Sequence, residues 1–129
     1  MPESTNPNDF FIPGWSSREK AGQDLDVVAP GNWVVGPWQL QMGKISYFFA
    51  FGTSMASPHV AGIVALMAEK DGTLTAAQAE SILQASAIPM PAGSRTVTEI
   101  GGNSVTYSWN TDATGHGLAT ADAALAATP

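Results

Sequence analysis

Hydrophobic and polar residues follow different periods along the chain, and these periods predict its strands. Residues 25–29, four of them apolar, stop at the turn Pro30-Gly31 and are expected to form a short buried strand. Residues 44–51 place aromatic and apolar residues on both sides of a two-residue period, so we expect a strand with both faces at least partly covered. Between these runs, Gly36-Pro37 and Gly43 indicate an irregular stretch.

Helical spacing follows in the second half of the chain. Residues 54–69 leave almost no polar stripe, which predicts a helix buried on nearly all sides. A second helix is expected over 75–86, where Thr75 and Gln78 have the spacing of a capping box. An alanine-rich segment, 120–127, predicts a short final helix.

Two further segments complete the predicted organisation, a hairpin and an extended N-terminal stretch. β-Branched and aromatic residues alternate with polar ones over 96–100 and 104–109 around Gly101-Gly102-Asn103, which predicts a hairpin at the surface. Residues 1–14 are rich in Pro, Asn and acidic residues and are expected to be extended or poorly ordered, with apolar anchors at Phe10, Phe11 and Ile12. None of these segments indicates a domain boundary within residues 1–129.

Composition narrows the class of protein. The chain has 129 residues, of which 44% are hydrophobic and 12% charged, values typical of one globular domain with a real core. Its net charge of −6 and its scattered basic residues disfavour nucleic-acid binding. Without cysteine there is no disulfide and no thiolate site. The longest apolar run, 60–68, is too short to span a membrane, and residues 1–8 lack the basic start of a signal peptide.

One stretch contains the residues that indicate a chemical function: Gly52-Thr53-Ser54-Met55-Ala56-Ser57-Pro58-His59-Val60-Ala61-Gly62. It joins a strand, a glycine turn and the start of a helix, so the N–H of Ser54 is among the donors that lack a helical acceptor. Such a donor, at the positive end of the helix dipole, can bind an oxygen on which negative charge develops. Acyl transfer needs this arrangement.

This stretch resembles the nucleophile motif of the subtilisin-like serine peptidases at all eleven positions. Two flanking runs also resemble the family: Leu25 to Gly31, and Gly115-His116-Gly117-Leu118 before the alanine-rich helix. The resemblance extends from about Trp15 to Ala127. It implies an α/β chain that forms the C-terminal part of a three-layer fold, with a mostly parallel sheet and a central buried helix that begins at the nucleophile.

The resemblance also implies roles for individual residues. Ser54 would be the nucleophile and a backbone oxyanion donor, and Thr53 would support the oxyanion hole. Gly52 and Met55 would flank the site, and oxidation of Met55 to the sulfoxide would alter it. No acids at calcium-loop spacing are present, so no metal is expected on this chain, although calcium is compatible with a full-length parent.

Three departures from the family pattern bear on activity. Phe51 replaces a small or polar residue, and residues 89–109 form a longer stretch than compact family members have. More important, the family's triad runs Asp, His, Ser along the chain, and its Asp, its His and the oxyanion-hole Asn would lie upstream of this sequence. We therefore expect the chain alone to be nearly inactive. The family implies a polypeptide substrate and an extracellular or cell-envelope location.

The other titratable residues have simpler structural interpretations. His59 lies five residues after Ser54, a rotation of about 500° and a rise of about 7.5 Å along a helix, so the two side chains point to different faces. His116 lies in a glycine loop, and Asp26 and Asp112 are expected to be solvated or to cap local backbone. The tryptophans and the strand aromatics are expected in the core.

Three functional hypotheses remain open at this point. The chain could carry the nucleophile of a serine endopeptidase, be a catalytically inactive remnant that acts as a folding or interaction module, or be one half of a split protease completed by the missing N-terminal part of the peptidase domain. A serine esterase is disfavoured, because the stretch around Ser54 lacks the second glycine of that enzyme's motif.

Overall fold

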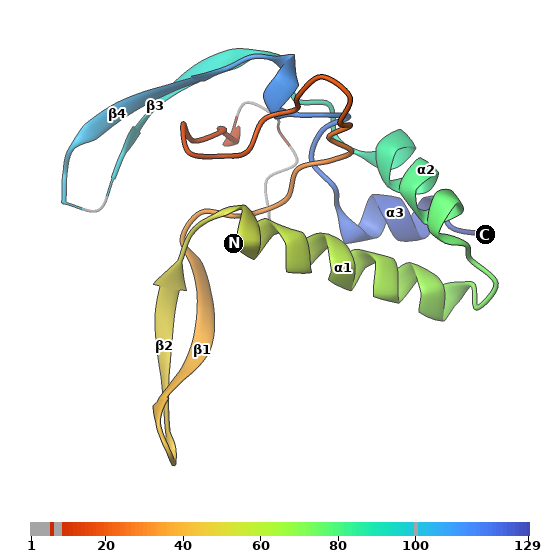
Figure 1. Ribbon diagram of the computed structural model, residues 1–129, viewed down its shortest axis with the longest axis horizontal. Helices are drawn as coiled ribbons and strands as arrows, with labels where there is room; N and C mark the ends of the chain where they lie inside the picture. Colours follow the sequence, from red (N-terminus) through yellow and green to blue (C-terminus); the bar gives the residue numbers. More distant parts are fainter. Residues whose placement is uncertain (1–5, 7–8, 100) are drawn as a thin grey trace.

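Helices and hairpins follow one another along the chain (Figure 1). The computed structural model describes residue 6, residues 9–99 and residues 101–129. Its elements are β1 (Val34–Gln41), β2 (Lys44–Ala50), α1 (Thr53–Lys70), α2 (Ala76–Ser86), β3 (Gly93–Thr98), β4 (Ser104–Trp109), a 3₁₀ turn (Thr111–Ala113) and α3 (Ala121–Ala127). Parts of two predicted segments, 1–14 and 96–100, lie outside the described residues.

All three predicted helices are confirmed within a residue or two. The capping box at the start of α2 is complete: the Gln78 N–H donates to Thr75 Oγ1 at 3.3 Å, and the Thr75 N–H donates to Gln78 Oε1 at 2.9 Å. At the end of α1, the hydroxyl and N–H of Thr73 donate to the carboxylate of Asp71, which lowers the pKa of that carboxyl. Within the described residues, no helix has the length and apolar character needed to cross a membrane.

The stretch expected to be irregular forms a strand instead. β1 pairs with β2 in antiparallel register, with Val34 opposite Ala50 and Pro37 opposite Tyr47. Proline is tolerated here because each strand of a two-stranded hairpin has one free edge, where a missing N–H donor costs nothing. The prediction of an irregular stretch was wrong because it relied on Gly and Pro residues that lie within the hairpin.

The β1–β2 hairpin projects away from the helices (Figure 1), so little of the rest of the chain covers it. Tyr47 is 74% exposed and Phe49 is 61% exposed. The expectation that both faces of this strand are at least partly covered is therefore wrong for the face that carries these two residues. The second hairpin, β3–β4, confirms the prediction, with Val97 opposite Val105, and it is anchored by the buried Trp109 at the end of β4.

The predicted strand 25–29 forms a short ladder rather than part of a sheet. Val28 pairs with Leu118 in parallel, and Leu118 pairs with Ile88 in antiparallel. The two sheets among the described residues are antiparallel hairpins, so the expected mostly parallel sheet is not formed there. A parallel sheet needs several strands joined by crossovers, and the five residues 25–29 supply a single strand.

The core lies on both sides of this ladder. On one side Val27 packs with the helices, in a cluster whose buried members are Ile63, Met67, Ala79, Leu83, Ala119 and Ala124. On the other side Val28 packs with residues from the N-terminal loop and the C-terminal half, in a cluster whose buried members are Ile12, Met90, Trp109, Ala113 and Leu118. Adjacent strand residues point to opposite faces, which explains why two neighbouring valines belong to different clusters.

The expectation that α1 is buried on nearly all sides is wrong. Ile63 and Met67 are its buried residues, whereas Leu66 is 44% exposed. The apolar residues that contact the other helices recur every three or four positions, so they occupy one side of α1. Its opposite side has apolar residues that no other element of the described chain covers.

Gly117 gives a prediction about stability, because the ladder leaves no room for a side chain there. Its φ is +125°, and a Cβ would lie 2.0 Å from the carbonyl oxygen of Ile88. We expect Gly117→Ala to lower the free energy of unfolding by more than about 4 kcal/mol or to abolish folding. Gly22→Ala, at φ +82° but with nothing within 4 Å, should cost about 1–2 kcal/mol. Urea denaturation followed by circular dichroism measures both, and equal losses would show that the ladder is not tightly packed.

Candidate functional site

The glycine turn between β2 and α1 positions the candidate site. Gly52 caps α1 with a φ of 144°, a region that side-chain-bearing residues rarely adopt. Its N–H donates to the carbonyl of Gly31 at 2.8 Å, so the turn is tied to the segment that follows the Val28 ladder. A Cβ on Gly31 would lie 2.9 Å from Gly52 O and 3.4 Å from the Ala56 Cβ. Two glycines therefore allow the backbones to approach closely at this point.

Ser54 is the second residue of α1, and its side chain is exposed. The first intrahelical bond runs from Met55 N–H to Gly52 O at 3.0 Å. Within the part of the chain that the structure describes, the Ser54 N–H has no hydrogen-bond acceptor. A free hydroxyl and a free N–H on the same residue, at the positive end of an 18-residue helix, can act on one carbonyl group as nucleophile and oxyanion donor.

His59 lies five residues after Ser54, is exposed, and forms a hydrogen bond with the backbone of its own helix. Its Nδ1 lies 2.7 Å from Met55 O, four residues earlier, which fixes Nδ1 as the donor because a carbonyl oxygen only accepts. The ring is thus held along the helix beside Met55. No hydrogen bond within the described residues joins it to Ser54.

His116 and Asp26 form hydrogen bonds at the ladder, whereas Asp112 forms one outside it. His116 donates its backbone N–H to Asp26 O at 2.9 Å, and the Asp26 carboxylate accepts from Gln84 Nε2 at 2.7 Å, which links the ladder to α2. The backbone carbonyl of Asp112 accepts from the N–H of Glu19 at 2.8 Å. The bond of the Asp26 carboxylate to Gln84, far away in the sequence, differs from the solvated or locally capping role expected for it. The roles expected for the His116 and Asp112 side chains stay predictions, because these bonds involve only the backbone of those residues. Among the residues described, no three His, Asp or Glu side chains are grouped to hold a metal ion.

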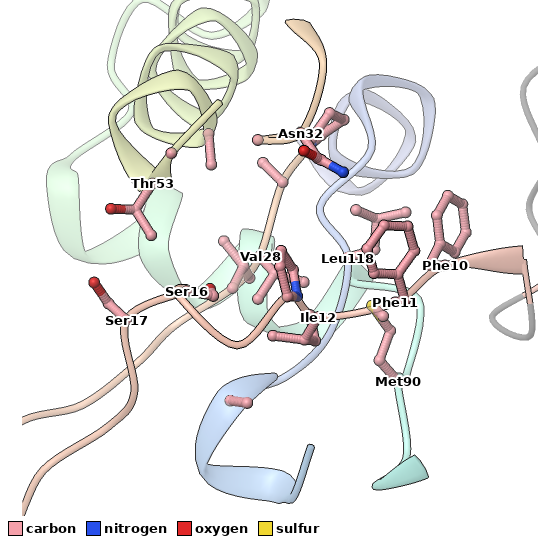
Figure 2. Close-up of a pocket in the computed structure, with 18 of the residues that line it drawn as sticks. Phe10, Phe11, Ile12, Ser16, Ser17, Val28, Asn32, Thr53, Met90 and Leu118 are labelled. Carbon is pink, nitrogen blue, oxygen red and sulfur yellow. The ribbon is translucent and has the colours of Figure 1, made fainter. Parts of the chain in front are cut away.

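A cavity of about 430 Å³ lies beside the start of α1. Figure 2 shows Thr53 on one side, Phe10, Phe11 and Met90 on the other, and Val28 between them. Ser54 is not among its lining residues, but its neighbours Thr53, Ala56 and Ser57 are. The sequence did not predict this cavity, because its wall comes from the N-terminal loop folding back onto a segment that lies far along the chain.

Several aromatic rings lie close to one another in the segments that flank the glycine turn. The Trp33 ring centroid lies 5.6 Å from that of Phe49 and 6.0 Å from that of Phe51, and Trp15 lies 5.9 Å from Phe51. Trp33 also has a positive φ of 55°, a strained conformation for a large residue. Trp15 and Trp33 are 44% and 39% exposed, so the expectation of core tryptophans holds for Trp109 and is wrong for these two.

The comparisons with known proteins agree on one family. The sequence model of the Subtilase family matches residues 11–121. An "Extracellular protease" of Xanthomonas campestris pv. campestris is 40% identical over 80 residues, which cover 59% of this chain and 14% of that protein. "Subtilisin" of Bacillus pumilus is 42% identical over 72 residues, covering 56% and 25%. "Thermitase" of Thermoactinomyces vulgaris is 39% identical over 67 residues, covering 52% and 21%. The chain spans a quarter or less of the length of these relatives.

The close approach of Gly31 to Gly52 gives a prediction about the glycine turn. Gly31→Ala places a methyl group 2.9 Å from Gly52 O, so the turn must shift, and we expect a loss of about 1–3 kcal/mol in unfolding free energy. The amide NMR shifts of Gly52, Ser54 and Met55 should move with it. Gly36→Ala, with nothing within 4 Å, is the matched control and should leave those shifts unchanged. Unmoved Ser54 and Met55 shifts in Gly31→Ala would show that Gly31 does not position the turn.

Proposed function

The chain belongs to the subtilase family, and we propose that it supplies the nucleophile of a serine endopeptidase whose triad is completed by another polypeptide segment. The observation that supports this most directly is Ser54 at the start of α1, exposed and with a free N–H, within the family's eleven-residue motif. The sequence relatives named subtilisin and thermitase support the same assignment.

The proposed reaction is acyl transfer to Ser54. The Oγ of Ser54 attacks the carbonyl carbon of a peptide bond while a histidine of the completing segment takes its proton. The oxyanion accepts a hydrogen bond from the Ser54 N–H, with Thr53 as a supporting residue. The C–N bond then breaks as the histidine returns the proton to the leaving amine, and water hydrolyses the acyl-enzyme by the same steps. Gly52 and Met55 flank the reacting atoms.

The chain by itself is proposed to be nearly inert, because neither of its histidines serves Ser54. His59 is bonded to Met55 O and His116 belongs to the ladder. In subtilisin, removal of the catalytic histidine lowers kcat about 10⁶-fold, a value measured on that enzyme. The competing hypothesis is that the chain is an inactive remnant. The lack of a histidine that serves Ser54 also favours that hypothesis.

We also propose that the assembled protein has the family's three-layer arrangement, with residues 25–29 in a mostly parallel sheet and α1 at its centre. Two observations support this. The Val28–Leu118 bridge is parallel, and apolar clusters lie on both of its faces. Polypeptide is the proposed substrate. An extracellular location is proposed because one relative is named "Extracellular protease".

Labelling with a fluorophosphonate probe tests the proposed nucleophile. The chain alone should label no faster than its Ser54→Ala variant, since the hydroxyl is not activated. Mixed with a recombinant part of a subtilisin-family relative that carries the triad Asp and His, it should label at Ser54, as identified by mass spectrometry. Ser57→Ala, which removes an exposed hydroxyl one turn along the same helix, is the matched control and should label normally.

Two outcomes would contradict the proposal. Rapid labelling of the chain alone would show that a base is already present. Failure to label when the added segment is demonstrably bound would favour the inactive remnant.

A further inference from the structure

The dipeptide Asp71-Gly72 begins the connection from α1 to α2 and is the single place in the sequence where Gly follows Asp or Asn. A peptide nitrogen that follows an aspartate can attack the side-chain carboxyl and close a succinimide ring. Glycine favours this attack, because it has no side chain to hinder its nitrogen. Gly72 and Thr73 are exposed, so water reaches the bond. Isoaspartate formation is therefore expected here before other positions of the chain.

The reaction needs no reactant other than water. The Gly72 nitrogen bonds to Cγ of Asp71 and loses its proton, while the carboxyl loses one oxygen, so that one water molecule leaves. Water then adds to the ring at the former main-chain carbonyl of Asp71, and the C–N bond at that carbon breaks. The main chain now runs through the side-chain carbons of residue 71, and its former main-chain carbonyl is a free carboxylate.

The backbone conformation of Asp71 opposes ring closure. Its ψ of 97° turns the Gly72 nitrogen away from the Asp71 Cβ, so the ring closes only after rotation about the Cα–C bond. That rotation breaks a turn in which the N–H of Leu74 donates to the carbonyl of Asp71 at 3.1 Å. The N–H of Asp71 is in turn bonded to Met67 O at 2.9 Å, which ties residue 71 to the last turn of α1.

Thr73 holds the side chain of Asp71 in the same unreactive arrangement. Its hydroxyl donates to Asp71 Oδ1 at 2.7 Å, and its N–H donates to the same oxygen at 2.9 Å. Both bonds are lost when Cγ turns toward the Gly72 nitrogen. The hydroxyl, and after it the N–H, also lower the pKa of the Asp71 carboxyl. An ionised carboxylate gives up an oxygen less readily than the neutral acid does, so this effect acts in the same direction.

We propose that Asp71-Gly72 is a site of spontaneous isoaspartate formation, and that the Thr73 hydroxyl slows the reaction by holding the carboxylate away from the Gly72 nitrogen. The site lies at the end of α1 opposite to Ser54, about 25 Å along the helix, so it is independent of the proposed reaction (Figure 1). The isomerised main chain has one extra carbon atom between α1 and the capping box of α2, which disrupts the turn from Asp71 to Leu74.

Two substitutions at position 73 test the role of the hydroxyl. Thr73→Val keeps the branched shape and the N–H but removes the hydroxyl donor, whereas Thr73→Ser keeps the donor. After incubation of the folded chain at neutral pH, a glutamate-specific protease releases residues 70–80, and chromatography with mass spectrometry separates the aspartate and isoaspartate forms of this peptide. Thr73→Val should form isoaspartate about three- to tenfold faster than the unaltered chain, and Thr73→Ser at the same rate as that chain.

Gly72→Ala is the control for the position of attack. The φ of Gly72 lies outside the left-handed region and a Cβ there meets nothing within 4 Å, so the fold should be kept while isoaspartate forms several-fold more slowly. Equal rates in Thr73→Val and the unaltered chain would overturn the proposal, as would an unaltered chain that forms none at residue 71. Deamidation at Asn103-Ser104 is distinguished because it raises the mass, whereas isomerisation of Asp71 does not.

Discussion

The backbone ladder between residues 26–28 and 116–119 is the constraint on which the rest of the structure depends. It joins two segments about ninety positions apart in the sequence, and its parallel bridge separates the two apolar clusters. Its formation requires Gly115 and Gly117, because any Cβ there would lie 2.0 Å from a carbonyl oxygen of the facing chain. The backbone hydrogen bonds of the ladder thus determine where helices and loops can pack. Burial of Val27 and Val28 on its two faces then stabilises the ladder.

The candidate site follows from this ladder through a second backbone contact. The chain leaves the ladder at Pro30, and Gly31 O then accepts from Gly52 N–H, which holds the turn before α1. The position of Ser54 is therefore determined by main-chain geometry at two glycines rather than by side-chain contacts around the hydroxyl. This arrangement suits a nucleophile, because the serine keeps an exposed Oγ and an N–H with no other acceptor in the described chain.

Two features of the described chain are exposed: the apolar side of α1 that carries Leu66, and the aromatic face of the β1–β2 hairpin. Each presents groups that usually lie inside a protein, and large exposed apolar patches commonly mark interaction surfaces. The absence of a base for Ser54 among the described hydrogen bonds agrees with the same conclusion. These observations are consistent with the proposal that the chain works together with another segment.

Sequence alone determined the elements whose signals are local. The capping box at Thr75, the helical spacing of α1 and the alternation in β3 and β4 depend on neighbours within a few residues, and the eleven-residue motif located Ser54 by its family likeness. Tertiary structure decided what depends on distant partners. β1 forms despite Pro37 because the hairpin edge is free, and α1 stays half exposed because only one side meets the other helices. The cavity arises where the N-terminal loop meets the ladder, and periodicity along one segment contains no information about which distant segment will contact it.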